Sequence, residues 1–331
     1  MSGPAGVRTG VWFQGGLKVD VAVALAAKAE EAGVDSVSVA EGPAARDALL
    51  TLAAIAAATT RVELFTGVVN SFTRHPAQLA ASFATLDELS GGRAACGLGV
   101  GARDGLVPLG VDVSRPLSAV RETIDVIRRL LAREAVDLDG TTFHLDQARL
   151  GMRPQRADLP IILGAAGPKM CALAGKAADG IYLMYGSRES VGTSLEHARA
   201  ARTTGAHLRV LSPVLMDVDT GDPSALTAIK AAIGFNLNEP NAEAVLEANG
   251  LHPGLAQPIR DGLARGGAKG LAAAVDDAIV DRMTIFGTHE QCVERLSEAV
   301  TWGINEPQVL LSGRDPSAQL AVLRDVKARL S

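Results

Sequence analysis

The chain has 331 residues, of which 47% are hydrophobic and 21% charged, a composition that excludes a disordered, collagen-like or coiled-coil protein. Thirty-two Lys and Arg residues against 37 Asp and Glu give a net charge of -5, which argues against a nucleic-acid or anionic-membrane partner. Three widely spaced cysteines form no zinc or disulfide pattern and no long apolar run occurs, so we expect a cytoplasmic protein without a metal site, signal peptide or membrane span.

Short β-branched segments alternate with amphipathic segments along the chain, which is typical of parallel sheets built from βα units. The pair Gly91-Gly92 ends one predicted helix, and Pro116 opens another whose apolar residues recur at intervals of 4, 3 and 4 positions. In chain order, we expect strands at 8–13, 35–40, 61–68, 94–99, 160–164, 180–184, 207–216 and 307–312, and helices at about 20–33, 44–58 and 75–90, after 116 and after 315.

About eight βα units are the number at which a parallel sheet closes, so the sequence predicts an α/β fold with a single (β/α)8 TIM barrel over residues 1–331. Two connections are too long for simple turns, and we interpret both as insertions in this one domain. The first, at about 134–158, contains the hairpin signal Asp139-Gly140, and the second, at about 218–303, contains several helices. In such barrels the catalytic groups lie on the loops after the carboxyl ends of the strands.

Motifs of several large enzyme classes are absent from the sequence. The run Gly97-x-Gly99-x-Gly101 resembles a dinucleotide fingerprint, but Asp104 replaces its last glycine. No Walker phosphate loop, nucleophile elbow or zinc-binding His-Glu-x-x-His pair occurs. Two glycine-rich strand ends, at 97–101 and 164–169, remain informative. The second leads into a helix, and it either holds a phosphate on backbone N–H groups or only permits close packing.

A series of short motifs follows along the chain. They are TTRVELFTGVVN at 59–70, RHP at 74–76, ATLD at 84–87 with LSGGR at 89–93, GLGVG at 97–101, AAGPKM at 165–170 with ADG at 178–180, and VDDA at 275–278 with FGT at 286–288. Their order resembles that of the luciferase-like flavin and deazaflavin oxidoreductase superfamily. Within this superfamily the chain is most similar to the methylenetetrahydromethanopterin reductase branch, which uses coenzyme F420, and the resemblance covers nearly the whole chain.

The resemblance implies a cofactor site at the carboxyl edge of the barrel. It implies a non-prolyl cis peptide bond at Gly67-Val68 behind the deazaflavin ring, an acidic residue near that ring and a phosphate-binding turn at 165–168. It also implies a homodimer or larger homo-oligomer, in line with apolar faces on the helices at 44–58 and 75–90. The implied cofactor-binding residues are Glu41, Gly67, Val68, Asn70, Ser71, Val100, Gly101, Ala165, Ala166, Gly167 and Pro168.

Three positions depart from the pattern of the relatives. Methylenetetrahydromethanopterin reductases carry a glutamate where this chain has Trp12. The F420-dependent sugar-phosphate dehydrogenases carry a histidine and a glutamate where this chain has Gly42 and Ala102. An indole has no titratable proton to give, so Trp12 cannot replace the glutamate as a proton carrier. The cofactor motifs are retained, whereas the catalytic residues on the substrate side have changed. We also interpret His75, which precedes a proline at the start of a predicted helix, as a structural residue that finishes the turn.

The sequence therefore predicts an F420-dependent oxidoreductase that transfers a hydride between the deazaflavin and a small organic substrate with a C=C, C=N or C=O group. We do not expect a true methylenetetrahydromethanopterin reductase. Two alternatives remain open, an FMN-dependent luciferase-like monooxygenase and a catalytically silent cofactor-binding homologue. The candidate catalytic residues are Glu41 and Trp12, and any proton comes from Glu41, Tyr182, Tyr185 or solvent.

Overall fold

Eight parallel strands form the centre of the computed structural model, which describes residues 7–239, 241–311 and 315–330. The strands are β1 (Gly10–Phe13), β2 (Ser36–Val39), β3 (Glu63–Thr66), β5 (Ala94–Gly99), β8 (Ile161–Gly164), β9 (Gly180–Tyr182), β10 (Arg209–Val214) and β13 (Glu306–Leu310). Their order in the sheet is β3-β2-β1-β13-β10-β9-β8-β5, and β3 also pairs with β5, so the sheet closes. The predicted eight-stranded barrel is confirmed.

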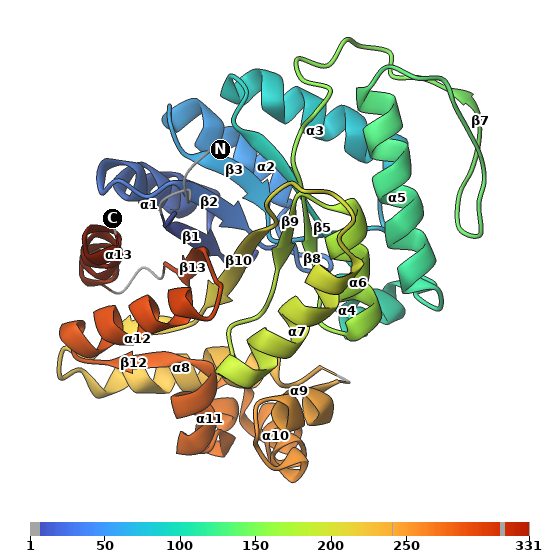
Figure 1. Cartoon of the computed structure of the whole chain (residues 1–331). Coiled ribbons are helices and arrows are strands. Elements are labelled where there is room, and N and C mark those ends of the chain that lie inside the picture. The colour runs from blue at the N-terminus through green and yellow to red at the C-terminus, as the bar shows by residue number, and fades with distance from the viewer. Residues whose placement is uncertain (1–6, 240, 312–314, 331) are drawn as a thin grey trace.

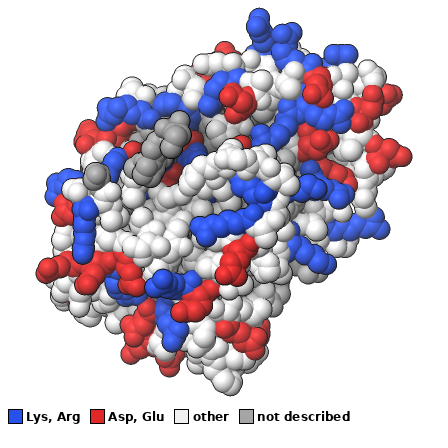
Figure 2. Space-filling view, viewed as in Figure 1, with Lys and Arg blue, Asp and Glu red and all other residues white. Residues whose placement is uncertain are grey.

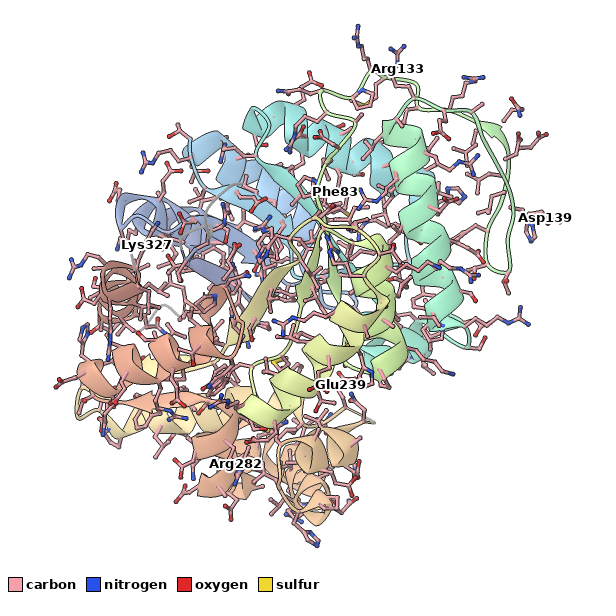
Figure 3. The ribbon with its side chains drawn as sticks, viewed as in Figure 1. Phe83, Arg133, Asp139, Glu239, Arg282 and Lys327 are labelled. Atoms are coloured by element: carbon pink, nitrogen blue, oxygen red, sulfur yellow. The ribbon has the colours of Figure 1, made fainter. Side chains whose placement is uncertain are left out.

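A ring of helices surrounds this barrel (Figure 1). The helices are α1 (Val19–Glu31), α2 (Ala48–Ala58), α3 (Pro76–Ser90), α5 (Pro116–Leu131), α6 (Pro168–Ala177), α7 (Arg188–Ala201), α12 (His289–Thr301) and α13 (Pro316–Leu330), with a short α4 (Arg103–Leu106) after β5. Their apolar faces cover the outward side chains of the strands. Phe83 of α3, which is 0% exposed, belongs to this layer and lies toward the interior in Figure 3.

Two strands are interrupted where the sequence predicts one continuous strand. The predicted strand at 61–68 ends at Thr66, and the chain pairs again only as β4 (Val69–Asn70). The predicted strand at 207–216 ends at Val214, and β11 (Met216–Val218) pairs instead with β12 (Ile285–Gly287). Apolar residues continue through both breaks, so the sequence pattern does not mark them. Residue 312, the predicted end of the last strand, lies outside the described residues.

The first insertion is a hairpin of β6 (Val136–Asp139) and β7 (His144–Ala148), as the sequence predicts. Glu122 of α5 anchors it, because its buried carboxylate accepts the backbone N–H groups of residues 141, 142 and 143 at 2.9, 2.9 and 3.1 Å. Burial alone raises the pKa of Glu122, but these hydrogen bonds lower it below its ordinary value. Asp139 lies at the outer edge of the molecule (Figure 3).

The second insertion contains α8 (Pro223–Asn236), α9 (Ala242–Ala248), α10 (Ala256–Ala274) and α11 (Asp277–Met283). Helices α9, α10 and α11 form the lower edge of the molecule in Figure 1. The insertion builds its own apolar cluster, which also includes Trp12 of β1 and Leu215. The sequence predicts that this insertion extends to residue 303. Helix α12, however, packs against α13 and β13 as a member of the ring around the barrel, so the insertion ends before α12.

Four charged side chains fill the amino end of the barrel interior. Arg209 of β10 bonds Glu63 of β3 at 2.6 Å and Glu306 of β13 at 2.7 Å. Arg8 bonds the same two glutamates at 2.8 and 3.0 Å. Because β3 and β10 are not neighbours in the sheet, the bond between Arg209 and Glu63 crosses the barrel. Burial alone lowers the pKa of Arg209, because it disfavours the charged form. The hydrogen bonds and negative charges of Glu63 and Glu306 outweigh this effect, so the pKa of Arg209 is raised.

A line of hydrogen bonds continues from Glu306 toward the carboxyl end of the barrel. Ser36 Oγ donates to Glu306 at 2.6 Å, and Gln308 Nε2 donates to Ser36 Oγ at 2.7 Å. Ser38 Oγ then lies 3.4 Å from Gln308 Oε1 and 3.4 Å from the hydroxyl of Tyr182. All of these side chains are buried. Polar side chains therefore occupy a part of the interior where TIM barrels usually hold aliphatic layers.

Helices α6 and α7 touch through a glycine, and this contact gives a test of the packing. A Cβ on Gly175 would lie 1.8 Å from the carbonyl oxygen of Ala198, whereas nothing lies within 4 Å of a Cβ on Gly192. We predict that Gly175→Ala lowers the free energy of unfolding by about 1–3 kcal/mol, because the two helices must move apart. Gly192→Ala, the matched control, raises it by about 0.5–1 kcal/mol. Chemical denaturation measures both, and equal effects would contradict the contact.

Candidate functional site

The predicted cofactor residues meet at one edge of the barrel. Strands β2, β3, β5 and β8 are consecutive in the sheet, and because they are parallel their carboxyl ends share one edge. Trp12 lies near the end of β1, the neighbour of β2 on the other side. The residues that follow the four strands form a continuous arc: Glu41 after β2, Gly67 and Val68 after β3, Val100 and Gly101 after β5, and 165–168 after β8.

The bulge after β3 consists of Gly67 and Val68, whose connecting peptide bond is cis. Glycines on two neighbouring strands make room for the side chain of Val68. A Cβ on Gly99 would lie 2.7 Å from Val68 Cγ2, and a Cβ on Gly164 would lie 3.2 Å from Val68 Cγ1. Gly67 in turn leaves space for the hydroxyl of Tyr182, which is 3.1 Å from its Cβ position. Close packing therefore accounts for these strand-end glycines.

Asn70 and Ser71 bond to the backbone of the loop that they begin. Asn70 Oδ1 accepts the backbone N–H groups of Phe72 at 2.9 Å and Thr73 at 2.8 Å. Ser71 is fully buried, and its hydroxyl lies 3.5 Å from the carbonyl oxygen of Gly99. These contacts fix the shape of the loop beside the edge. A contact between either side chain and a cofactor stays a prediction.

Gly101 closes the loop after β5 in a conformation that favours glycine. Its φ is +75°, and a Cβ on it would lie 3.0 Å from the Cβ of Asn70. The preceding residue, Val100, is half-buried and packs against the main apolar core. The backbone of this loop is therefore held close to the loop after β4, with little side-chain volume between them.

The turn between β8 and α6 presents open backbone to the edge. The N–H group of Ala165 donates to the carbonyl oxygen of Tyr182 at 3.2 Å, while Ala166 is exposed. Gly167 is the N-cap of α6, gives its first turn no side-chain cap and has nothing within 4 Å of its Cβ position. Pro168 is the first helical residue. An uncapped helix start with free space around it is suited to an anion.

Glu41 is the charged residue of the arc, and Arg74 holds it. Nη1 of Arg74 bonds Glu41 Oε1, and Nη2 of Arg74 bonds Asp47 Oδ2 at 2.7 Å. The hydrogen bond to Glu41 contributes most to raising the pKa of Arg74. The side chain of Glu41 is 10% exposed, and its Oε2 is buried with no hydrogen-bond partner among the described residues. A buried carboxylate oxygen without a donor is costly, which makes this atom a candidate ligand contact.

Trp12 is enclosed between the barrel and the second insertion. Its side chain belongs to the apolar cluster of α8–α11, with 7% of the residue exposed. The indole N–H lies 3.4 Å from the carbonyl oxygen of Val214, the last residue of β10. The ring therefore joins the ends of two barrel strands to the insertion, and contact with a substrate stays a prediction.

The two candidate tyrosines lie in different layers. Tyr182 points into the barrel, where its ring packs edge-on against Phe65 at a centroid distance of 5.9 Å. Tyr185 stacks on Trp302, which ends α12, at a centroid distance of 6.0 Å, so its ring lies in the helical layer. Burial raises the pKa of both hydroxyls, which keeps them protonated at neutral pH. Of the two, only Tyr182 lies beneath the bulge at Gly67.

His75 has a structural role, as the sequence predicts, and this role is to cap α3. Its Nδ1 accepts the backbone N–H of Ala77 at 3.2 Å at the start of α3, and its ring packs edge-on against Phe143. Gly42, one of the positions where relatives carry a catalytic side chain, has only Ala45 near its Cβ position. This part of the edge is therefore lined by small residues.

Two residues of the site region were missed by the sequence analysis. Arg74 belongs to the motif at 74–76, but the motif does not predict its pairing with the carboxylate of Glu41, 33 positions earlier. Asn249, which follows α9, accepts the N–H of Ser187 at 2.6 Å and so ties the insertion to the loop after β9. Arg282, labelled in Figure 3, donates to the carbonyl oxygen of Asn249 at 3.3 Å. No sequence motif predicts these interactions, because the partners lie far apart along the chain.

Several other chemistries find no support in the described part of the chain. All three cysteines are buried, and burial raises the pKa of each thiol, to about 11 for Cys292. Residues 7–239, 241–311 and 315–330 contain no group of three His, Cys, Asp or Glu side chains placed to hold a metal ion. Positive and negative side chains are interspersed on the face seen in Figure 2. In the same residues, every helix is too short or too polar to cross a membrane.

Comparison with known proteins agrees with this architecture. The luciferase-like monooxygenase family matches residues 5–306. The 5,10-methylenetetrahydromethanopterin reductase of Methanolobus tindarius is 31% identical over 283 residues, which cover 84% of this chain and 86% of that protein. An F420-dependent glucose-6-phosphate dehydrogenase of Nakamurella multipartita is 36% identical over 182 residues, which cover 51% of this chain and 53% of that protein.

A solved structure supports the fold over the full length. The coenzyme F420-dependent tetrahydromethanopterin reductase from Methanopyrus kandleri superposes with a TM-score of 0.85 and 23% identity. The superposition covers 99% of this chain and 100% of that one. The family match and the relative from Methanolobus tindarius confirm the resemblance inferred from the sequence motifs.

Proposed function

Because the chain belongs to the luciferase-like monooxygenase family, we propose that it is an oxidoreductase that binds coenzyme F420 and transfers a hydride between the deazaflavin and a small organic substrate. The substrate carries a C=C, C=N or C=O group. The observation that carries this proposal is the arc of cofactor residues on four consecutive strands, with the unpartnered Oε2 of Glu41 within it. Relatives named for F420 supply the choice of cofactor.

The residues of the edge fit such a cofactor. The buried Oε2 of Glu41 lacks a hydrogen-bond donor, and a ligand N–H or O–H group supplies one. The open start of α6 at Gly167 has room for a phosphate. The bulge at Gly67 and Val68 offers an apolar surface without long side chains. When bound, the deazaflavin supplies the hydride chemistry.

The chain's own residues bind and orient the cofactor, and they exclude water from the site. Glu41 accepts a hydrogen bond from the cofactor. The backbone N–H groups of Ala166 and Gly167, in the turn at 165–168, hold the phosphate of the cofactor. Trp12 and the second insertion cover one side of the edge and limit the access of water. Tyr182 stays protonated beneath the bulge and is bonded to Ser38, so it stiffens the floor of the site.

The substrate side differs from that of the named relatives. Trp12, Gly42 and Ala102 stand where we expect relatives to carry acids or a histidine. We therefore propose a substrate other than methylenetetrahydromethanopterin. The Trp12 side chain is enclosed by apolar residues, which favours an uncharged substrate next to it.

Assembly and location are also proposals. Leu50 of α2 and Leu89 of α3 are 72% and 60% exposed, although both are large apolar residues. Exposed apolar side chains on adjacent ring helices favour a homodimer or larger homo-oligomer. The three reduced, buried cysteines agree with a cytoplasmic location.

The cofactor choice gives the direct test of the proposed function. We predict that the protein binds F420 at least about tenfold more tightly than FMN, a difference of about 1.4 kcal/mol in binding free energy. Fluorescence titration with each compound measures both dissociation constants. Tighter binding of FMN would favour a luciferase-like monooxygenase instead. Binding of F420 without turnover of any alkene, imine or carbonyl compound would favour a catalytically silent homologue.

The turn before α6 gives a second test. Gly167→Glu places a negative charge where the phosphate of the cofactor is expected, and the open space around Gly167 lets the protein fold normally. We predict that this variant binds F420 at least about tenfold more weakly than the wild type. Gly167→Gln, the control, adds similar volume without charge and loses less affinity. Equal dissociation constants for the wild type and Gly167→Glu would mean that the turn serves only packing.

Trp12 gives a test of the substrate side. We predict that the wild type does not reduce a methylenetetrahydropterin with reduced F420, as followed by the absorbance of the cofactor. Trp12→Glu restores little activity, because it buries a carboxylate in the apolar cluster of the insertion. Trp12→Phe serves as a folding control, because it keeps the apolar ring. Robust turnover by the wild type would show that Trp12 does not mark a change of substrate.

A further inference from the structure

Three charged side chains from different segments meet at the carboxyl edge. Glu41 follows β2, Asp47 is the N-cap of α2, and Arg74 lies in the loop before α3. Asp47 accepts the N–H of Leu50 at 3.0 Å through Oδ1, and Arg74 through Oδ2. Burial raises the pKa of Asp47, but these bonds lower it below its ordinary value. The guanidinium of Arg74 is thus shared between two carboxylates.

Because Arg74 bonds both Glu41 and Asp47, one carboxylate oxygen of Glu41 is left without a hydrogen-bond donor. An arginine that serves one carboxylate usually bonds both of its oxygens, one to each of two guanidinium nitrogens. Here Nη2 of Arg74 is taken by Asp47, so Glu41 receives only Nη1, on Oε1. Glu41 Oε2 remains buried without a donor, although the side chain is 90% covered. Among the described residues it is the one carboxylate oxygen that is buried without a hydrogen-bond donor, and it lies at the edge where the cofactor residues meet.

We propose that Arg74 is a positioning residue that fixes the carboxylate of Glu41 so that its free oxygen accepts a hydrogen bond from the ligand. This inference rests on the proposed function of the edge as a cofactor site. A carboxylate oxygen is an acceptor only, so the ligand atom that it meets is an N–H or O–H donor. A phosphate or a carbonyl oxygen does not fit this position. Asp47 takes part indirectly, because it holds the second nitrogen of Arg74.

The test is a double-mutant cycle on the affinity for F420. The variants are Arg74→Met, Glu41→Gln and the double variant, and thermal melting checks that each is folded. We expect each single variant to bind F420 about tenfold more weakly than the wild type. We expect the double variant to bind no more weakly than the weaker single variant, because Arg74 acts through Glu41. Arg74→Lys should recover part of the affinity, since an ammonium group still reaches one carboxylate.

Arg129 provides a matched control, because it also bonds two carboxylates, Asp125 and Glu134, but lies on α5 outside the edge. Arg129→Met should leave the dissociation constant unchanged. Independent, multiplicative losses in the double variant would overturn the inference, and so would unchanged binding by Glu41→Gln. Either result can occur while the wild type binds F420 normally, which leaves the proposed function intact. No binding of F420 by the wild type would overturn the proposed function itself and the inference with it.

Discussion

The barrel depends on ion pairs between charged side chains that become buried in its interior when the sheet closes. Arg8, which precedes β1, and Arg209 of β10 both contact Glu63 of β3 and Glu306 of β13 at the amino end of the interior. Glu306 is 1% exposed, so removal of either arginine would leave a buried charge without part of its compensation. These bonds fix the relative positions of β3, β10 and β13, and Ser36, Gln308 and Ser38 extend the polar contacts toward the carboxyl end.

The carboxyl edge is shaped by a second constraint, the lack of side-chain volume around Val68. Gly99 is required where a methyl group of Val68 lies, and Gly164 leaves room for its other methyl group. Gly97 is required because a Cβ there would lie 1.5 Å from the carbonyl oxygen of Thr66. The result is a surface made mostly of backbone, as the low aromatic content of 3% indicates. Such a surface suits a flat, rigid ligand, because few side chains must be ordered when it binds.

The two sides of the edge have different origins. The proposed cofactor side is built by short loops after β2, β3, β5 and β8, which are held by local turns and by close packing. The proposed substrate side is covered by the second insertion, whose apolar cluster includes Trp12. Asn249 links this insertion to the loop after β9. Changes in the insertion can therefore alter the substrate without disturbing the cofactor arc.

The sequence by itself determined the barrel, its strand order along the chain, the hairpin and the glycine-rich strand ends, because periodicity, turn residues and short motifs are local signals. It also led to the prediction that Glu41 and the turn at 165–168 bind the cofactor, although only through a resemblance to relatives. The sequence did not reveal the end of β10 at Val214, the enclosure of Trp12 or the role of Arg74. Those features arise from contacts between residues as far apart as 202 positions, as with Trp12 and Val214. Only the closed barrel brings such partners together, so tertiary structure alone decided which oxygen of Glu41 is left without a hydrogen-bond donor.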